Sequence, residues 1–123
     1  MINYLWVGLG GFFGAISRYA LSGFINRQFQ GSWFPYGTMA CNILGCLIIG
    51  LLAGLAESRS IFTPHTRLLI FVGILGGFTT FSSFGLETIY LLREHLYFSA
   101  FLNVVVSVVA GFFLVYLGLQ FTK

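Results

Sequence analysis

The sequence predicts an all-α membrane protein with four transmembrane helices in a single domain, residues 1–123. Hydrophobic residues make up 58% of the chain and charged residues only 7%, whereas a soluble domain carries about 25% charged residues. The mean hydropathy is +0.94. Because a water-soluble fold needs more polar surface than this, a soluble enzyme and a disordered chain fit poorly. The basic residues are scattered singly, so a nucleic-acid partner also fits poorly.

Four apolar segments are each long enough for a spanning helix, which needs about 20 residues. They cover about residues 4–24, 35–56, 66–92 and 97–121 and are joined by short polar loops. Pro35 suits the first turn of the second segment, where a missing backbone N–H costs little. One short bundle cannot enclose much space, so size alone predicts a homo-oligomer.

The basic residues give almost no preference for one orientation in the membrane. They divide between the two sides as Arg59, Arg67 and Lys123 on one, and Arg27, Arg93 and the more deeply placed Arg18 on the other. Loops rich in Lys and Arg stay on the cytoplasmic side. This balance leaves two interpretations open: one orientation set by other cues, or dual topology, in which the chain inserts both ways and pairs antiparallel.

The centre of the third segment is rich in glycine and hydroxyl groups. Residues 76–85 read GGFTTFSSFG, and at about 1.5 Å per residue Gly76 lies about 15 Å from Thr66, near the bilayer midplane. Paired glycines favour an unwound turn, and Ser and Thr can bond the freed backbone groups. The pattern predicts a helix broken at mid-membrane, where carbonyls can coordinate a cation. The alternative is a continuous helix that packs its small face on a neighbour.

Phe81 and Phe84 share one face of this segment if it is helical, because they are spaced i, i+3. Most of the 15 phenylalanines must face lipid or the core. A pair of electropositive ring edges could instead favour a small anion without a formal charge that would hold it too tightly.

Neutral polar side chains recur inside the other segments. Asn42 lies about two turns inside the second segment and needs a partner there. In the fourth, a stripe recurs every four residues: Ser99, Asn103, Ser107 and Gly111. Such a stripe suits a pore lining or hydrogen bonds between helices, and both remain open.

Few titratable groups lie inside the segments. Arg18 can reach the interface, bond exposed carbonyls or mark an ion vestibule. Glu87 follows the predicted break by about two turns. Cys41 and Cys46 are turned about 140° apart on a helix, which predicts two small buried residues rather than a disulfide or a metal pair. His65 and His95 fall in loops, and no role is predicted for them.

Glycine pairs at i, i+4 spacing predict close helix packing in three segments. The pairs are Gly10 and Gly14, Gly50 and Gly54, and Gly73 and Gly77.

The stretch from Gly76 to Phe84 resembles the signature of the Fluc (CrcB) family of fluoride channels. The glycine-rich run from Gly10 to Arg18 is similar to that family, and so is Gly37-Thr38 followed by Asn42. The resemblance covers essentially the whole chain. It implies an antiparallel, dual-topology homodimer in the lipid of a bacterial inner membrane, with two pores. It also implies passive fluoride export that limits fluoride toxicity, and no enzymatic activity.

The resemblance further implies roles for individual residues. Main-chain oxygens of Gly76 and Thr79 from both subunits would hold one structural Na⁺ at the dimer centre. The residues implied along the fluoride pore are Asn42, Phe81, Ser82, Ser83, Phe84 and Ser107. Arg18 would lie near the aqueous vestibule and Glu87 near the pore mouth. The Ser83 position is often threonine in the family, which preserves the hydroxyl.

Two other classes of membrane protein remain as alternatives. A small proton-coupled multidrug exporter shares the size and the dual topology, but it needs a membrane-embedded carboxylate that the first segment lacks. A non-transporting subunit of a larger membrane complex predicts no ion flux from the purified protein.

Overall fold

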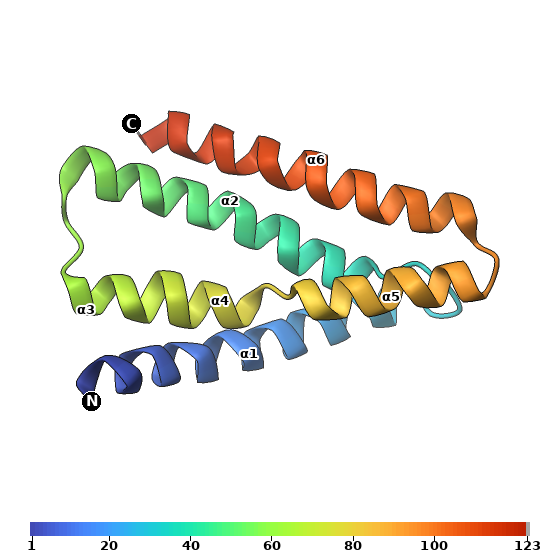
Figure 1. The fold of residues 1–123 in the computed structure, drawn as a ribbon, viewed down its shortest axis with the longest axis horizontal. Helices are drawn as coiled ribbons and strands as arrows, with labels where there is room; N and C mark the ends of the chain where they lie inside the picture. The colour runs from blue at the N-terminus through green and yellow to red at the C-terminus, as the bar shows by residue number, and fades with distance from the viewer. Residues whose placement is uncertain (123) are drawn as a thin grey trace.

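The computed structural model describes residues 1–122; Lys123, one of the basic residues counted above, lies outside the described residues. The regular structure of the described residues is helical throughout (Figure 1). The elements are α1 (Ile2–Gln28), α2 (Tyr36–Arg59), α3 (Pro64–Arg67), the π-helix η1 (Leu68–Ile74), α4 (Leu75–Phe78), α5 (Phe81–Arg93) and α6 (Tyr97–Thr122). Elements α3 to α5 together form the third helical stretch.

The four predicted segments coincide with four helical stretches that differ from them by about one turn or less at each end. Pro35 lies one position before its predicted place: it is the N-cap of α2, and its carbonyl accepts a hydrogen bond from the Met39 N–H at 3.1 Å. The π-helix was not predicted. Its backbone hydrogen bonds join residues five apart rather than four apart, and hydropathy carries no signal for that difference.

Three of the described helical stretches are long and apolar enough to cross a membrane, judged by length and composition: Tyr36–Arg59, Pro64–Arg93 and Tyr97–Thr122. Helix α1 has 27 residues but is not among the three, since its Gly, Ser, Asn and Arg residues lower its hydropathy. That α1 also spans the membrane stays a prediction.

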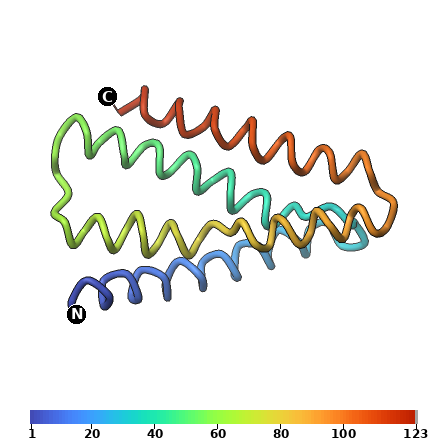
Figure 2. The backbone as a smooth tube through the Cα atoms, viewed as in Figure 1, coloured from blue at the N-terminus to red at the C-terminus, as the bar shows by residue number. Residues whose placement is uncertain are grey.

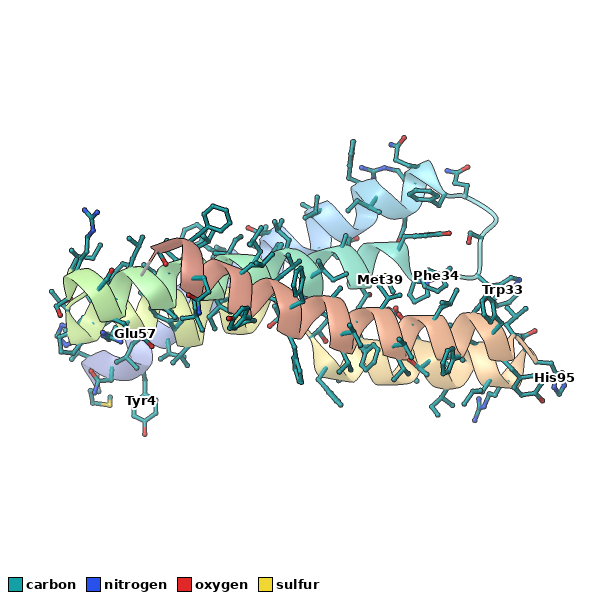
Figure 3. All side chains as sticks on the ribbon, turned by 90° about the horizontal axis from the view of Figure 1, so that it is seen from above. Tyr4, Trp33, Phe34, Met39, Glu57 and His95 are labelled. Atoms are coloured by element: carbon teal, nitrogen blue, oxygen red, sulfur yellow. The ribbon has the colours of Figure 1, made fainter. Side chains whose placement is uncertain are left out.

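The bundle has two distinct ends. The two termini and the connection between α2 and α3 lie at one end, and the other two connections lie at the opposite end (Figure 1). Tyr4 and Glu57 mark the first end, and Trp33 and His95 mark the second (Figure 3). Aromatic residues with a polar tip are typical of membrane–water interfaces.

The two halves of the third helical stretch pack on different neighbours. The first half, η1 and α4, runs beside α1 and packs on it (Figure 2). The second half, α5, packs on α6. Helices α2 and α6 make the most extensive contact in the bundle. The third stretch therefore passes from α1 to α6, and the change of partner falls at its midpoint.

The predicted glycine pairs are confirmed as sites of close helix packing within the chain. A methyl group on Gly10 would lie 2.8 Å from the Cα of Gly73, and one on Gly77 would lie 2.9 Å from the carbonyl oxygen of Gly11. Each paired glycine meets a neighbouring helix in this way: Gly10, Gly14, Gly50, Gly54, Gly73 and Gly77. In lipid, such close approach is a main source of helix association.

Gly10→Ala is expected to destabilise the protein by about 1–3 kcal/mol, because the added methyl group meets backbone that cannot rotate away. Gly8→Ala on the same helix is the matched control, since a methyl group there meets no atom within 4 Å. The melting temperatures of both variants in detergent test this. Equal melting temperatures would show that α1 does not need close contact with the third helical stretch.

Candidate functional site

The third helical stretch is interrupted between α4 and α5. Thr79 (φ −95°, ψ 156°) and Thr80 (φ −150°, ψ 119°) are both extended. The break is confirmed within the predicted stretch, residues 76–85, and it falls at the threonines rather than at the paired glycines, since Gly76 and Gly77 are helical. Gly77 packs closely on α1, whereas β-branched threonine tolerates extended backbone well.

The Asn42 side chain of α2 holds the extended backbone at two points. Its Nδ2 donates to the Thr80 carbonyl oxygen at 3.0 Å, and its Oδ1 accepts from the Thr80 N–H at 2.8 Å. The amide thus forms the two hydrogen bonds that another peptide group would otherwise form. It satisfies both the N–H and the carbonyl oxygen of Thr80, which lies outside the helices. This pairing answers the predicted need of Asn42 for a partner.

The two threonines also cap the helix ends created by the break. The Thr80 Oγ1 accepts from the Ser83 N–H at 3.1 Å, which caps the start of α5. The Thr79 Oγ1 donates to the Leu75 carbonyl oxygen at 2.9 Å, which closes the last turn of α4. Side-chain caps of this kind stabilise a helix end by about 1 kcal/mol.

Main-chain oxygens of Gly76 and Thr79 lose their helical donors at the break. In a continuous α-helix they would accept from the N–H groups of Thr80 and Ser83. Those N–H groups donate to Asn42 Oδ1 and Thr80 Oγ1 instead. The two oxygens predicted to hold a cation are therefore left with free lone pairs near the middle of the stretch.

Arg18 lies beside the same break, on α1. Its Nε donates to the Gly77 carbonyl oxygen at 3.0 Å. Of the three roles open to Arg18 in the sequence, the structure shows the second: it bonds an exposed carbonyl. The positive charge of Arg18 also lies near the negative, C-terminal end of the α4 helix dipole, where it is stabilising.

A groove of about 530 Å³ lies along the break and is open to the outside of the chain. Its lining includes six predicted site residues: Asn42, Gly76, Thr79, Phe81, Phe84 and Ser107. The remaining lining is mostly apolar and comes from α2, η1, α4 and α6. The groove thus gathers most of the predicted pore residues and both predicted cation ligands.

Phe81 and Phe84 form an edge-to-face pair in this groove. Their ring centroids are 5.7 Å apart and the ring planes meet at 84°. The shared face predicted from their spacing is confirmed. Phe81 is 73% exposed, so much of its ring is turned outward, away from its own chain.

Ser107 contributes a hydroxyl without a partner. Its Oγ is buried and makes no hydrogen bond within the described residues, although it borders the groove. A buried hydroxyl without a partner costs about 1–3 kcal/mol. A bound polar species in the groove would remove that cost.

The other predicted site residues do not line this groove. Ser82 is exposed on the first turn of α5, and Ser83 contributes its backbone N–H to the Thr80 cap. Glu87 lies in a second hollow of about 300 Å³ with Trp33 and Arg93. The Thr38 hydroxyl donates to Glu87 Oε1 at 2.7 Å, while Oε2 is buried without a partner within the described residues.

The polar residues of the α6 stripe lie in two different environments. Asn103 is 1% exposed and its Nδ2 donates to the Thr88 Oγ1 at 2.9 Å, which is a bond between helices. Ser107, one turn later, faces the groove. The interpretation as a hydrogen bond between helices is thus confirmed for Asn103, whereas a pore lining at Ser107 stays a prediction.

Sequence reasoning missed three threonines that hold the site. Thr38 precedes Asn42 by four residues and so shares its helix face, which could have indicated its place. Thr80 lies three residues before Ser83, a spacing typical of an N-cap. Thr88 has no such signal, because its partner is on another helix.

Within residues 1–122, no group of three or more His, Cys, Asp or Glu side chains could hold a metal ion. Cys41 and Cys46 are free thiols, as predicted; Cys41 is buried, but Cys46 is only half-buried. His65 stacks on Trp6 with ring centroids 5.7 Å apart. His95 Nδ1 lies 2.9 Å from the Tyr97 hydroxyl. Any cation at the break would therefore have to bind main-chain oxygens or the oxygens of neutral side chains.

Comparison with known proteins gives a full-length match. A family model described as "CrcB-like protein, Camphor Resistance (CrcB)" matches residues 5–119. The "Fluoride-specific ion channel FluC" of Methylobacillus flagellatus is 46% identical over 123 residues, covering 100% of this chain and 96% of the relative. Its namesake in Shewanella frigidimarina is 46% identical over 120 residues, 98% of this chain and 95% of the relative.

A third relative extends the match. The FluC of Nitratidesulfovibrio vulgaris is 42% identical over 118 residues, 96% of this chain and 94% of the relative. With the apolar helices described above, these matches identify a membrane protein. The family model covers nearly the whole chain, and the broken third stretch lies within the matched residues, so this chain belongs to the CrcB family.

Proposed function

We propose that this protein is a fluoride-specific ion channel rather than an enzyme, and that it exports fluoride passively and so limits fluoride toxicity. The observation that carries the proposal is the match, end to end, to proteins that bear the name "Fluoride-specific ion channel". The groove at the break supports it, because its polar side chains are neutral and include hydrogen-bond donors, with no charged side chain among its lining residues.

Neutral donors suit a small, strongly hydrated anion. The Asn42 amide has two N–H groups, of which one bonds Thr80, so the other can face an ion. The Ser107 hydroxyl and the ring edges of Phe81 and Phe84 border the same groove. Together they can replace water around fluoride without holding it as tightly as a lysine or arginine would.

The proposed assembly is an antiparallel homodimer with dual topology, two pores and α1 as the fourth span, in a bacterial inner membrane. The groove is open along one side of the chain, and Phe81 is largely exposed there. A second copy can close this open side. The near balance of basic residues between the two ends supports insertion in both orientations.

The proposed cofactor is one structural Na⁺ held by the Gly76 and Thr79 main-chain oxygens of both copies. The residues fit such an ion, since both oxygens lie at the break and their helical donors are engaged elsewhere. Hard cations prefer oxygen ligands of this kind. When bound, the ion would supply a fixed positive charge and join two broken helices.

Removal of sodium is expected to lower the melting temperature of the purified protein. Protein exchanged into N-methylglucamine chloride would melt several degrees lower, and NaCl at the same ionic strength would restore the value. The magnitude follows from loss of a ligand that binds only the folded state. A melting temperature independent of Na⁺ would contradict the sodium site.

Ion efflux from proteoliposomes tests the function itself. Vesicles loaded with fluoride and, separately, with chloride would be followed with ion-selective electrodes. Rapid fluoride loss with little chloride loss is the expected result. Loss of neither ion from folded protein in Na⁺ would overturn the channel proposal and favour an accessory subunit. A multidrug exporter is disfavoured because α1 contains no Asp or Glu.

A further inference from the structure

One hydroxyl connects α6 to the backbone that carries Phe84. The Thr88 Oγ1 donates to the Phe84 carbonyl oxygen at 2.8 Å and accepts from Asn103 Nδ2 at 2.9 Å. A threonine hydroxyl has a single proton to donate. The two hydrogen bonds therefore run in one direction, from Asn103 through Thr88 to the main chain of Phe84.

Asn103 is a buried polar residue, and its burial needs a physical explanation. Its side chain is 1% exposed and lies on a helix whose other residues are mostly Phe, Leu and Val. Burying an amide is costly unless it is hydrogen-bonded, and a leucine could fill similar space at no such cost. The amide therefore provides something that packing does not, namely a directed bond to α5.

Helix α5 needs such a bond because the break disconnects it from α4. The extended residues Thr79 and Thr80 interrupt the ladder of helical hydrogen bonds, so the rotation of α4 does not fix that of α5. Asn42 of α2 holds the chain where α5 begins. One further point of attachment sets the rotation of the helix, and Asn103 supplies it from α6, about two turns on.

We propose that Asn103, acting through Thr88, is a positioning residue that fixes the rotation of α5 and thereby the place of the Phe84 ring in the groove. The inference rests on the proposed function for its effect on flux: a displaced ring edge meets the permeating ion less well. Its structural part, the placement of the ring, does not depend on which ion permeates.

The variants are chosen so that folding and positioning can be separated. Thr88→Val removes the hydroxyl at nearly constant volume but leaves the Asn103 amide buried without a partner. The double variant Thr88→Val with Asn103→Leu removes both polar groups. It leaves neither side chain with a buried polar group that lacks a partner, so it folds even if the single variant does not. Thr88→Ser retains the hydroxyl. Ser99→Ala removes a hydroxyl of the polar α6 stripe that takes no part in these two hydrogen bonds.

The first readout is spectroscopic and needs no transport. A single 4-fluorophenylalanine at position 84 is observed by fluorine NMR, with a control label at the exposed Phe12 of α1. The double variant is expected to shift or broaden the signal at position 84 and to leave that at position 12 unchanged. Thr88→Ser and Ser99→Ala should keep both signals.

The second readout is fluoride efflux. The double variant is expected to lose about tenfold in rate, comparable to the loss of one hydrogen bond, and Thr88→Ser to stay near the original rate. A double variant with an unchanged signal at position 84 and unchanged efflux would overturn the inference. If the unsubstituted chain conducts no fluoride while the signal still moves, the proposed function fails and the positioning role stands.

Discussion

Replacing Phe81 or Phe84 with isoleucine is expected to reduce fluoride efflux by about two- to tenfold. Isoleucine is apolar, so the groove stays formed, but it has no electropositive edge to turn toward an anion. Edge contacts of an aromatic ring are worth about 0.5–1.5 kcal/mol, and each 1.36 kcal/mol added to a barrier slows a rate about tenfold. Both rings border the same groove, so either change should act.

The measurement is fluoride efflux from liposomes, paired with gel filtration to confirm that the oligomeric state is unchanged. Phe12→Ile is the matched control, because Phe12 is 59% exposed on α1 and does not border the groove at the break. Unchanged flux in both the Phe81 and the Phe84 variant would remove the ring edges from the ion path.

Asn42→Leu is expected to abolish fluoride efflux. The change leaves the N–H and the carbonyl oxygen of Thr80 without their partner, and it places an apolar branch in the groove. Each buried polar group left without a partner costs about 1–3 kcal/mol, so the melting temperature should fall as well. The predicted pore role of Asn42 and its observed hold on the backbone both lead to loss of flux.

A second substitution distinguishes the two roles of Asn42. Asn42→Asp keeps an acceptor for the Thr80 N–H but adds a negative charge to the groove. It should therefore retain more thermal stability than Asn42→Leu while still conducting poorly, since like charges repel. Asn3→Leu, in the exposed first turn of α1, is the control. Normal flux in Asn42→Leu would show that the amide neither lines the path nor holds the break.

The fold was largely predictable because its signals are local. Long apolar runs mark the helices, and the i, i+3 spacing of Phe81 and Phe84 placed them on one face. The break was predicted within residues 76–85 but not assigned to Thr79 and Thr80, because glycine in a membrane helix can indicate either an unwound turn or close approach of a neighbouring helix. Packing decides between them, and the partner of Gly77 is on α1.

The bonds that hold the site were beyond sequence reasoning for a different reason. Asn42 bonds Thr80, and Thr38 bonds Glu87, across distances in the chain that no helical or strand period connects. Asn103 and Thr88 lie on adjacent helices, but their pairing depends on how those helices are rotated. Hydropathy fixes which segments are helical and leaves that rotation undetermined.

The two main-chain oxygens freed at the break bear on why a chain in lipid should associate at all. Membrane helices gain little from apolar contact with one another, because lipid tails are as apolar as the side chains they replace. A polar group without a partner at membrane depth costs several kcal/mol. In the proposed dimer, a cation shared by the Gly76 and Thr79 oxygens of both copies would supply what these carbonyls lack in a solitary chain, so ion binding and association would lower the free energy together.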